Sequence, residues 1–283
     1  MTLTKLYFCP TPIGNLSDIS LRTLEVLEMV DIIACEDTRV SVKLLNHYNI
    51  KKKLFSYHEH NEHEASEKLL AFLKEGKSIA LITDAGMPGI SDPGEILARH
   101  AIEAGIEFTV LPGASAIFLA LLQSGFSSRR FIFEGFLPRK GKERQAILNA
   151  WENEGRTIIF YEAPHRLEKT LEELKSLFPN RPLSVSRELT KKFEETIRGT
   201  CQSVYEHFST HSIKGEFVLV LGKEEQTNPD DSFSLALKKA QDLLLQGYKT
   251  KAACNQVAKD FNLPKRTLYQ ALISDLNMSE GEN

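Results

Sequence analysis

Residues 78–94 carry the sequence SIALITDAGMPGISDPG, in which an apolar run leads into a loop that holds three glycines and two prolines. The run 78–83 has the length and apolar character of a buried strand. The loop after it is rigid and small, so a ligand can approach its backbone closely. Asp84 follows the strand directly, at the edge where open α/β sheets bind their ligands. The stretch therefore predicts an α/β fold with a ligand site at this strand end; the alternative is an elaborate turn without a ligand.

Strand and helix signals alternate on both sides of this stretch. Strands are predicted over residues 5–9, 31–35, 54–57, 78–83 and 108–111. Helices are predicted over residues 20–30, 40–48, 62–75 and 96–104. Strands separated by helices of this length indicate a mostly parallel sheet that is covered on both faces.

The pattern changes after residue 112. A helix over 116–123 precedes strands at 131–136, 157–161, 182–187, 196–200 and 216–221, with helices at 144–153 and 166–177. This order predicts an α/β domain with a mixed or antiparallel sheet. Residues 224–232 are polar and read as a linker. Three short helices are predicted beyond it, at 235–246, 251–260 and 264–274. We therefore expect domains at 1–112 and 113–223, the linker at 224–232 and a helical tail at 233–276.

Composition and charge exclude several classes of protein. A length of 283 residues predicts about two domains, or one large domain with an appendage. The net charge of −3 provides no global basic field, so any nucleic-acid binding must come from local patches. No apolar run approaches the ~18 residues of a membrane span, and the N-terminus lacks a signal peptide. The cysteines are too far apart in sequence for a metal pair, so we expect buried thiols in a reducing cytoplasm. They are Cys9, Cys35, Cys201 and Cys254.

Two further turns follow predicted strands of the first sheet. Residues 11–15 (TPIGN) follow the first strand, and residues 112–115 (PGAS) follow the fifth. Neither is a GxGxxG or P-loop motif, and each alone resembles an ordinary turn. Three such turns at the strand exits of one sheet imply a shared cleft.

Charged and histidine side chains also follow strands. Residues 36–39 (EDTR) can do acid–base chemistry or cap a helix. His58, His60 and His63 follow the third strand, but no further ligand has a suitable spacing, so no metal site is predicted. Residues 161–166 (YEAPHR) end another strand and form a candidate site edge.

The motifs together resemble the ribosomal RNA small subunit methyltransferase I family, within the tetrapyrrole-methylase-like, class III S-adenosylmethionine methyltransferases. They are TPIGNLSDISLRTLE (11–25), EDTR (36–39), TDAGMPGISDPG (83–94), PGASA (112–116), FEGFLPRK (133–140), YEAPHR (161–166) and RELTKKFEE (187–195). The resemblance covers about residues 5–222, and the tail is similar to a helical appendage of many members. It implies two α/β domains of the tetrapyrrole methylase type, S-adenosylmethionine in the cleft between them, and a homodimer. The implied reaction methylates the ribose 2′-hydroxyl of a cytidine in the decoding region of 16S ribosomal RNA, so the implied partner is that RNA or the small ribosomal subunit.

Site residues carry over by motif. The resemblance implies that the cofactor contacts Pro12, Asp84, Met87, Ser115, Ala116, Glu162 and Leu189. This chain has DAGMPG where the wider superfamily has a GDPxxF-type loop, which puts the individual contacts there in doubt. Glu36 and His58 match acid–base positions of the tetrapyrrole branch. A base or a cation would help because a ribose hydroxyl is a weak acid.

Local basic groups make phosphate contacts credible despite the negative net charge. The RNA-binding candidates are Arg39, Arg139, Lys140, Lys142, Arg166, Lys191, Lys251, Lys265 and Arg266. The tail's helix spacing fits a helix-turn-helix. The alternatives are a solvated surface for the basic runs and a simple three-helix core for the tail.

Two other functions remain open at this point. One is a small-molecule methylase of the tetrapyrrole type, which would need neither basic loops nor a helical tail. The other is a nucleic-acid-binding regulator that senses a small ligand in the α/β part.

Overall fold

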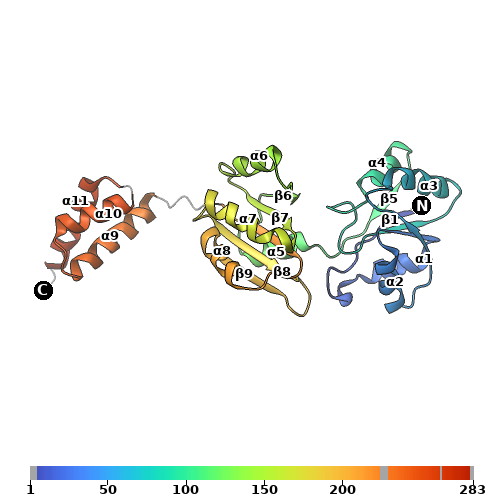
Figure 1. The fold of residues 1–283 in the computed structure, drawn as a ribbon, viewed down its shortest axis with the longest axis horizontal. Helices are drawn as coiled ribbons and strands as arrows, with labels where there is room; N and C mark the ends of the chain where they lie inside the picture. The colour runs from blue at the N-terminus through green and yellow to red at the C-terminus, as the bar shows by residue number, and fades with distance from the viewer. Residues whose placement is uncertain (1–4, 224–228, 262, 281–283) are drawn as a thin grey trace. The chain divides into compact units, whose positions relative to one another are not determined.

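The computed structural model describes residues 5–223, 229–261 and 263–280 (Figure 1). The chain divides into two compact units, Met1–Lys223 (unit 1) and Glu224–Asn283 (unit 2). Unit 1 contains two five-stranded sheets, which we call the first and the second lobe.

The first lobe is a parallel sheet with helices on both faces. Its strands, in the order β3-β2-β4-β1-β5, are β1 (Leu6–Phe8), β2 (Ile32–Cys35), β3 (Lys53–Ser56), β4 (Ile79–Ile82) and β5 (Phe108–Val110). Its helices are η1 (Leu16–Asp18), α1 (Leu21–Met29), α2 (Thr38–His47), α3 (Glu62–Lys74) and α4 (Glu95–Glu103). Side chains of α1 and α2 pack against one face, and those of α3 and α4 against the other. Every residue of β2 and β4 is therefore buried, as a covered parallel sheet requires.

The strand order creates a crevice between β1 and β4. The chain leaves β1 toward β2 on one side of the sheet, and it leaves β4 toward β5 on the other side. Such a switch point is where open α/β sheets bind ligands. The loops after β1 and β4 are thus the expected walls of a site.

The second lobe has a mixed sheet. Its elements are α5 (Ala116–Ser124), β6 (Phe131–Phe136), α6 (Lys142–Trp151), β7 (Thr157–Glu162), α7 (Pro164–Leu177), β8 (Pro182–Arg187), β9 (Glu195–Thr200), α8 (Cys201–Thr210) and β10 (Phe217–Leu221). The strand order is β6-β7-β10-β8-β9, in which β6 and β7 are parallel and the other pairs antiparallel. Helix α5 covers one face, and α6, α7 and α8 cover the other. The predicted α/β class and mixed sheet are confirmed.

Helix α8 was not predicted from the sequence. It begins with a capping box in which the Thr200 hydroxyl accepts from the Ser203 backbone N–H, while the Ser203 hydroxyl accepts from the Thr200 N–H. The usual sequence signal for such a box has Glu or Gln in the second position, so Ser203 gives a weak one.

Unit 2 is a three-helix unit with its own core. It contains α9 (Pro229–Leu245), α10 (Thr250–Asp260) and α11 (Lys265–Glu280). Its buried apolar side chains are Ala236, Ala240, Ala253, Cys254, Val257, Ala258, Leu268 and Leu272 among the residues that the structure describes. Residues 229–232, predicted as linker, form the first turn of α9, because proline is well suited to the start of a helix. The rest of the predicted linker, 224–228, lies outside the described residues.

The four cysteines are all buried and free. Burial raises the pKa of the Cys9 thiol to about 12, and it also raises the pKa of Cys35 and Cys254. Among the described residues, every helix is too short or too polar to serve as a bilayer span.

Two backbone hydrogen bonds join the loops at the crevice. Thr11 N donates to Gly86 O over 2.9 Å, and Gly86 N donates to Thr11 O over 3.0 Å. The Thr11 hydroxyl also donates to Thr83 O, at 3.0 Å. Gly86 has φ +83°, a conformation that side chains disfavour, and an added Cβ would lie 3.4 Å from Ile13. The loops after β1 and β4 thus form one surface.

We expect Gly86→Ala to destabilise unit 1. The left-handed backbone costs an alanine about 1–2 kcal/mol, and reduced freedom of the unfolded chain returns a part of this, so a net loss of about 1 kcal/mol is expected. Gly155→Ala is the matched control, since Gly155 has open space around its Cα and no left-handed φ. Urea unfolding followed by circular dichroism measures both; equal stabilities of the two variants would contradict the strain at Gly86.

Candidate functional site

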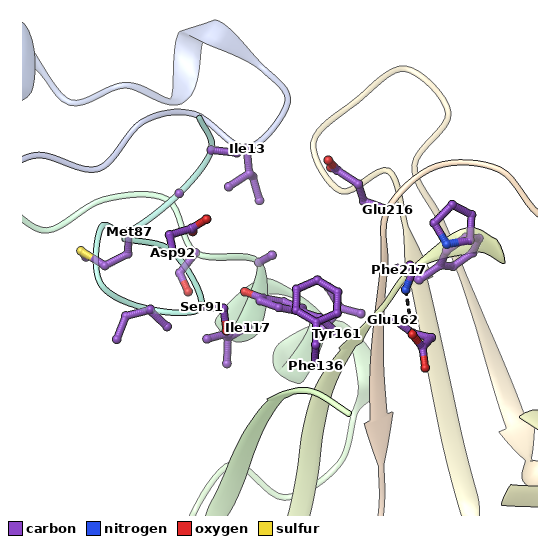
Figure 2. A pocket seen from close by; sticks show the side chains of 18 residues that line it. Ile13, Met87, Ser91, Asp92, Ile117, Phe136, Tyr161, Glu162, Glu216 and Phe217 are labelled. Atoms are coloured by element: carbon purple, nitrogen blue, oxygen red, sulfur yellow. Dashed lines mark hydrogen bonds between the residues drawn. The ribbon is translucent and has the colours of Figure 1, made fainter. Parts of the chain in front are cut away.

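A cavity of about 310 Å³ lies between the strand-exit loops of the first lobe and strands β7 and β10 of the second (Figure 2). It is lined by Ile13, Ala85, Gly86, Met87, Ile90, Ser91, Asp92, Ser115, Ala116, Ile117, Phe136, Tyr161, Glu162, Ala163, Pro164, Glu216, Phe217 and Val218. The lining is mainly apolar with a few polar groups, and the volume is at the lower end for small-molecule sites.

The loop after β4 supplies one wall of this cavity. Gly89 N donates to Pro93 O at 3.2 Å, and Ile90 N donates to Met87 O at 3.3 Å, so the loop folds back on itself. Ser91 has a left-handed φ of 60°, which turns the chain sharply. Figure 2 shows that Met87, Ser91 and Asp92 all come from this tight turn at the cavity.

Among the residues that line the cavity, Asp92 has the largest pKa shift. Burial, together with the nearby charges of Glu36, Asp84 and Glu216, raises the pKa of its carboxyl to about 7. A carboxyl that titrates near neutrality can accept a proton at physiological pH. The sequence analysis did not select Asp92 as a site residue, although Asp92 belongs to the glycine- and proline-rich loop, residues 84–94, that it singled out.

The predicted residues Asp84, Glu36 and His58 follow β4, β2 and β3 and do not line the cavity. Asp84 accepts a hydrogen bond from the backbone N–H of Asp37 at 3.2 Å, which ties two strand exits together. Burial raises the pKa of Asp84 and of Glu36, and the charge of Asp84 raises that of Glu36 further. The His58 Nδ1 is buried and has no hydrogen-bond partner among the residues that the structure describes. The charges of Glu36 and Asp84 nevertheless act on Asp92, and the charge of His58 acts on Glu36.

Four of the predicted cofactor residues, Met87, Ser115, Ala116 and Glu162, do line the cavity. The carboxylate of Glu162 is engaged inside the protein, where it accepts from Ala163 N at 2.9 Å and Thr170 Oγ1 at 2.6 Å and pairs with Arg166 at 3.0 Å. Glu162 thus anchors the start of α7.

Of the three predicted cofactor residues outside the lining, Asp84 is described above, and Pro12 and Leu189 lie next to the lining. Pro12 is buried directly before Ile13, and Leu189 is buried in the apolar cluster that holds Ile117 and Val218. Sequence reasoning did not select the lining residues Ile13, Phe136, Tyr161 and Glu216, because strands far apart in sequence bring them together.

The two lobes touch at the rim of the cavity. Asn15 N donates to the Thr190 hydroxyl at 3.1 Å. A Cβ at Gly14 would lie 2.5 Å from Lys191 Cγ, so only glycine permits this approach. Lys191 Nζ forms ion pairs with Glu188 at 3.0 Å and with Glu216 at 2.9 Å. The second pair holds the side chain of Glu216, which lines the cavity.

The predicted RNA-binding cations fall into two groups. Arg39 pairs with Asp37 at 2.6 Å, while Arg166 and Lys191 are held in the ion pairs given above, so their charges are partly neutralised. Arg139, Lys140 and Lys142 are exposed around the start of α6 and pair with no acid in the described part of the chain. Lys251, Lys265 and Arg266 are exposed on unit 2.

A basic hollow of about 320 Å³ adjoins the first of the exposed cations. It is lined by Arg139, Arg144, His165, Arg166, Lys169 and Thr170. Arg144 is buried and bonded to Glu173, so Arg139 and Lys169 are the exposed cations of this hollow. As for metals, residues 5–223, 229–261 and 263–280 hold no group of three or more His, Cys, Asp or Glu side chains placed to bind one.

Comparison with known proteins agrees with this geometry. The family description "Tetrapyrrole (Corrin/Porphyrin) Methylases" matches residues 5–205. The chain is 46% identical over 267 residues to "Ribosomal RNA small subunit methyltransferase I" of Synechocystis sp., covering 94% of this chain and 96% of that protein. The chain belongs to the ribosomal RNA small subunit methyltransferase I family. The resemblance stated from the motifs is confirmed.

A second relative and a solved structure are also similar to this chain. The protein of the same name from Thermotoga maritima is 44% identical over 221 residues, which are 99% of that protein and 78% of this chain. The structure of uroporphyrin-III C-methyl transferase from Thermus thermophilus, solved with S-adenyl homocysteine, superimposes with a TM-score of 0.54 at 17% identity. It covers 77% of this chain and 97% of that one. This second likeness shows a shared fold.

We expect Asp92→Asn to stabilise the protein above neutral pH. Because the folded-state pKa of Asp92 is about 7 against an ordinary 3.8, the folded protein binds more protons than the unfolded one between these values, so stability falls as pH rises through this window. Asparagine carries no charge to bury. Allowing for solvent screening of this partly buried group, we expect a gain of about 1–2 kcal/mol near pH 8 that shrinks toward pH 4.

Asp31→Asn is the control of opposite sign. Hydrogen bonds from Ser78 hold the pKa of Asp31 below its usual range, so its charged form stabilises the fold and the benefit is lost as pH falls. Urea titrations at several pH values measure both variants. A stability difference for Asp92→Asn that does not change with pH would contradict the raised pKa.

Proposed function

We propose that this protein transfers a methyl group from S-adenosylmethionine to the ribose 2′-hydroxyl of a cytidine in the decoding region of 16S ribosomal RNA. The observation that carries the proposal is the 46% identity, over nearly the full length of both chains, to a ribosomal RNA small subunit methyltransferase. The cavity between the lobes supplies a site for the chemistry.

The cavity residues fit S-adenosylmethionine. Small side chains at Ala85, Gly86, Ser115 and Ala116 leave room beside the apolar wall. Asp92 and Glu216 provide negative charge, and a cationic ligand would relieve the repulsion that raises the pKa of Asp92. The bound cofactor supplies a methyl group on a positively charged sulfur. We propose that Met87, Ser115 and Ala116 contact it, with Pro12 and Leu189 supporting the walls and Asp84 and Glu162 holding the loops.

We propose that Asp92 takes the proton of the ribose hydroxyl. A ribose hydroxyl is a weak acid, so its oxygen gains nucleophilicity as a base accepts the proton. Asp92 lines the cavity, while Glu36 and His58 do not. Glu36 instead raises the pKa of Asp92, and His58 moderates the charge of Glu36. In this proposal Glu36 tunes the pKa of Asp92 through its charge, and His58 acts on Asp92 only through Glu36.

Arg139, Lys140 and Lys142 are the cations of unit 1 best placed for phosphate contacts, since they are exposed and unpaired within the described residues. Lys251, Lys265 and Arg266 add contacts from unit 2. Arg39, Arg166 and Lys191 contribute less, because each is held by a carboxylate. The basic groups favour RNA over a tetrapyrrole, which needs neither these loops nor unit 2.

We further propose that the protein is a cytoplasmic homodimer. Its substrate is a ribosomal RNA, which supports the location. Large apolar side chains are exposed on and beside α5, namely Val110 at 52%, Phe118 at 60% and Leu122 at 82%. A second copy of the chain would remove this apolar surface from water.

A methylation assay tests the function. With labelled S-adenosylmethionine, the protein should label 16S RNA in small ribosomal subunits at a single ribose, mapped by resistance to alkali, and should leave uroporphyrinogen unlabelled. Label in the tetrapyrrole alone would overturn the proposal. The value of kcat/KM should rise with pH through about 7, since Asp92 of the free protein must be ionised, and Asp92→Asn should lower the rate by about 100-fold or more. An unchanged rate in that variant would exclude Asp92 as the base.

Removal of unit 2 should impair RNA binding and leave cofactor binding intact. A chain ending at Lys223 retains both sheets and their cores, and the Thermotoga relative is of about this length. It loses Lys251, Lys265 and Arg266, and each lost phosphate contact should reduce the log–log salt slope of RNA affinity by about 0.7–0.9. RNA titrations at several salt concentrations, beside calorimetry with S-adenosylmethionine, measure the two effects. If the full chain and the chain ending at Lys223 had identical salt slopes, unit 2 would not contact the RNA phosphates.

A further inference from the structure

We propose that Phe193 is a stacking platform for an unpaired base of the RNA substrate, with Lys192 beside it contacting the phosphate backbone. The inference rests on the proposed function, because it describes how the same site holds its RNA.

The Phe193 ring is unusually open to water. Its side chain lies in the loop between β8 and β9 and is 71% exposed, more than any other aromatic residue that the structure describes. A phenylalanine in water forgoes about 1.5–3 kcal/mol of burial energy. A single exposed ring is common on protein surfaces, so the surroundings must decide its role.

The loop that presents this ring is ordered by its own contacts. Glu188 and Thr190 adopt left-handed φ values of 51° and 65°. Lys191 N donates to Glu188 O at 2.9 Å, and Glu194 N donates to Lys191 O at 3.1 Å. The ring is therefore held out by a shaped turn, and a ligand that binds it has little loop entropy to remove.

The charges of the loop leave a cation free beside the ring. Glu188 pairs with Lys191, and Glu195 pairs with Arg187 at 2.7 Å. Glu194 accepts from Gln123 and from Thr190 N. Lys192 is exposed and pairs with no acid within the described ranges, and its Nζ lies over one face of the Phe193 ring, 5.7 Å from the centroid. A base would stack on the other face of the ring.

An aromatic face with an adjacent cation is the combination that binds single-stranded nucleic acid. Bases stack on the ring, and the cation follows the phosphates. A neutral carbohydrate leaves the cation without a partner, and a peptide that carries only acidic groups leaves the ring without one, whereas RNA uses both.

The loop is also joined to the cavity. Lys191 contacts Glu216, which lines the cavity, and Thr190 contacts Asn15, two residues after the lining residue Ile13. Phe193 is two residues from Lys191, a span of at most about 7–8 Å. The backbone of Phe193 is thus near the rim, and we propose that its ring meets a nucleotide that flanks the target ribose.

The chief alternative is an apolar contact with another protein or a second copy. Leucine retains apolar area but has no aromatic face, whereas tryptophan retains both. The comparison of Phe193→Trp, Phe193→Leu and Phe193→Ala therefore separates stacking from simple apolar contact.

The experiment measures RNA affinity and methylation of small ribosomal subunits by the full chain and these variants. We expect Phe193→Ala and Phe193→Leu to weaken RNA binding by about 5- to 100-fold, and Phe193→Trp to retain it. Affinity for S-adenosylmethionine and the oligomeric state, from calorimetry and light scattering, should not change. Lys192→Met should reduce the log–log salt slope by about 0.7.

Wild-type affinity in Phe193→Leu or Phe193→Ala, loss in Phe193→Trp, or a changed oligomeric state in any variant would overturn the inference. A wild-type protein that fails to methylate small subunits would instead overturn the proposed function, so the two failures are distinguishable.

Discussion

The pair of backbone hydrogen bonds between Thr11 and Gly86 is the interaction on which the site depends. Strands β1 and β4 are neighbours in the sheet, but the loops after them lead to opposite sides. Without a bond between them, each loop could move separately. The bridge places Ile13 and Met87 on one continuous surface, and the second lobe then closes against it through Asn15 and Thr190. The cavity thus inherits its shape from the backbone, so its side chains can serve chemistry rather than architecture.

A second constraint is the accumulation of acids around the crevice. Glu36, Asp84 and Glu216 all raise the pKa of Asp92, and Lys191 partly offsets them through its ion pair with Glu216. Like charges held together cost folding free energy, which the buried sheets on either side must supply. Such a cost is typical of functional sites, because the same field that strains the fold attracts a cationic ligand and tunes a base toward neutral pH. In the mechanism that we propose, one carboxyl group, that of Asp92, links stability and activity.

The strand-and-loop order of unit 1 could be predicted because apolar runs end in glycines, prolines and caps that act locally, as Ser20 does before α1. The site could be predicted only as far as the loops. That Asp92 faces the cavity, that Glu162 turns inward to Arg166, and that Lys191 is taken up by two glutamates all depend on residues far apart in sequence. Tertiary packing determines the direction of a side chain and its ion-pair partner, and a sequence motif contains no information on either. Helix α8 was missed for a different reason. Its capping box is a local signal, but it has Ser203 where Glu or Gln is usual.

The burial of all four cysteines has a practical consequence. A thiol reacts as its thiolate, and a pKa of about 12 at Cys9 leaves almost none of it ionised at neutral pH. The pKa values of Cys35 and Cys254 are raised in the same direction by burial. The native thiols will therefore compete poorly with a cysteine introduced on the surface. Pairs of spectroscopic labels can be attached to unit 1 and unit 2 without first removing the natural cysteines, so the distance between the units can be measured directly, with and without RNA.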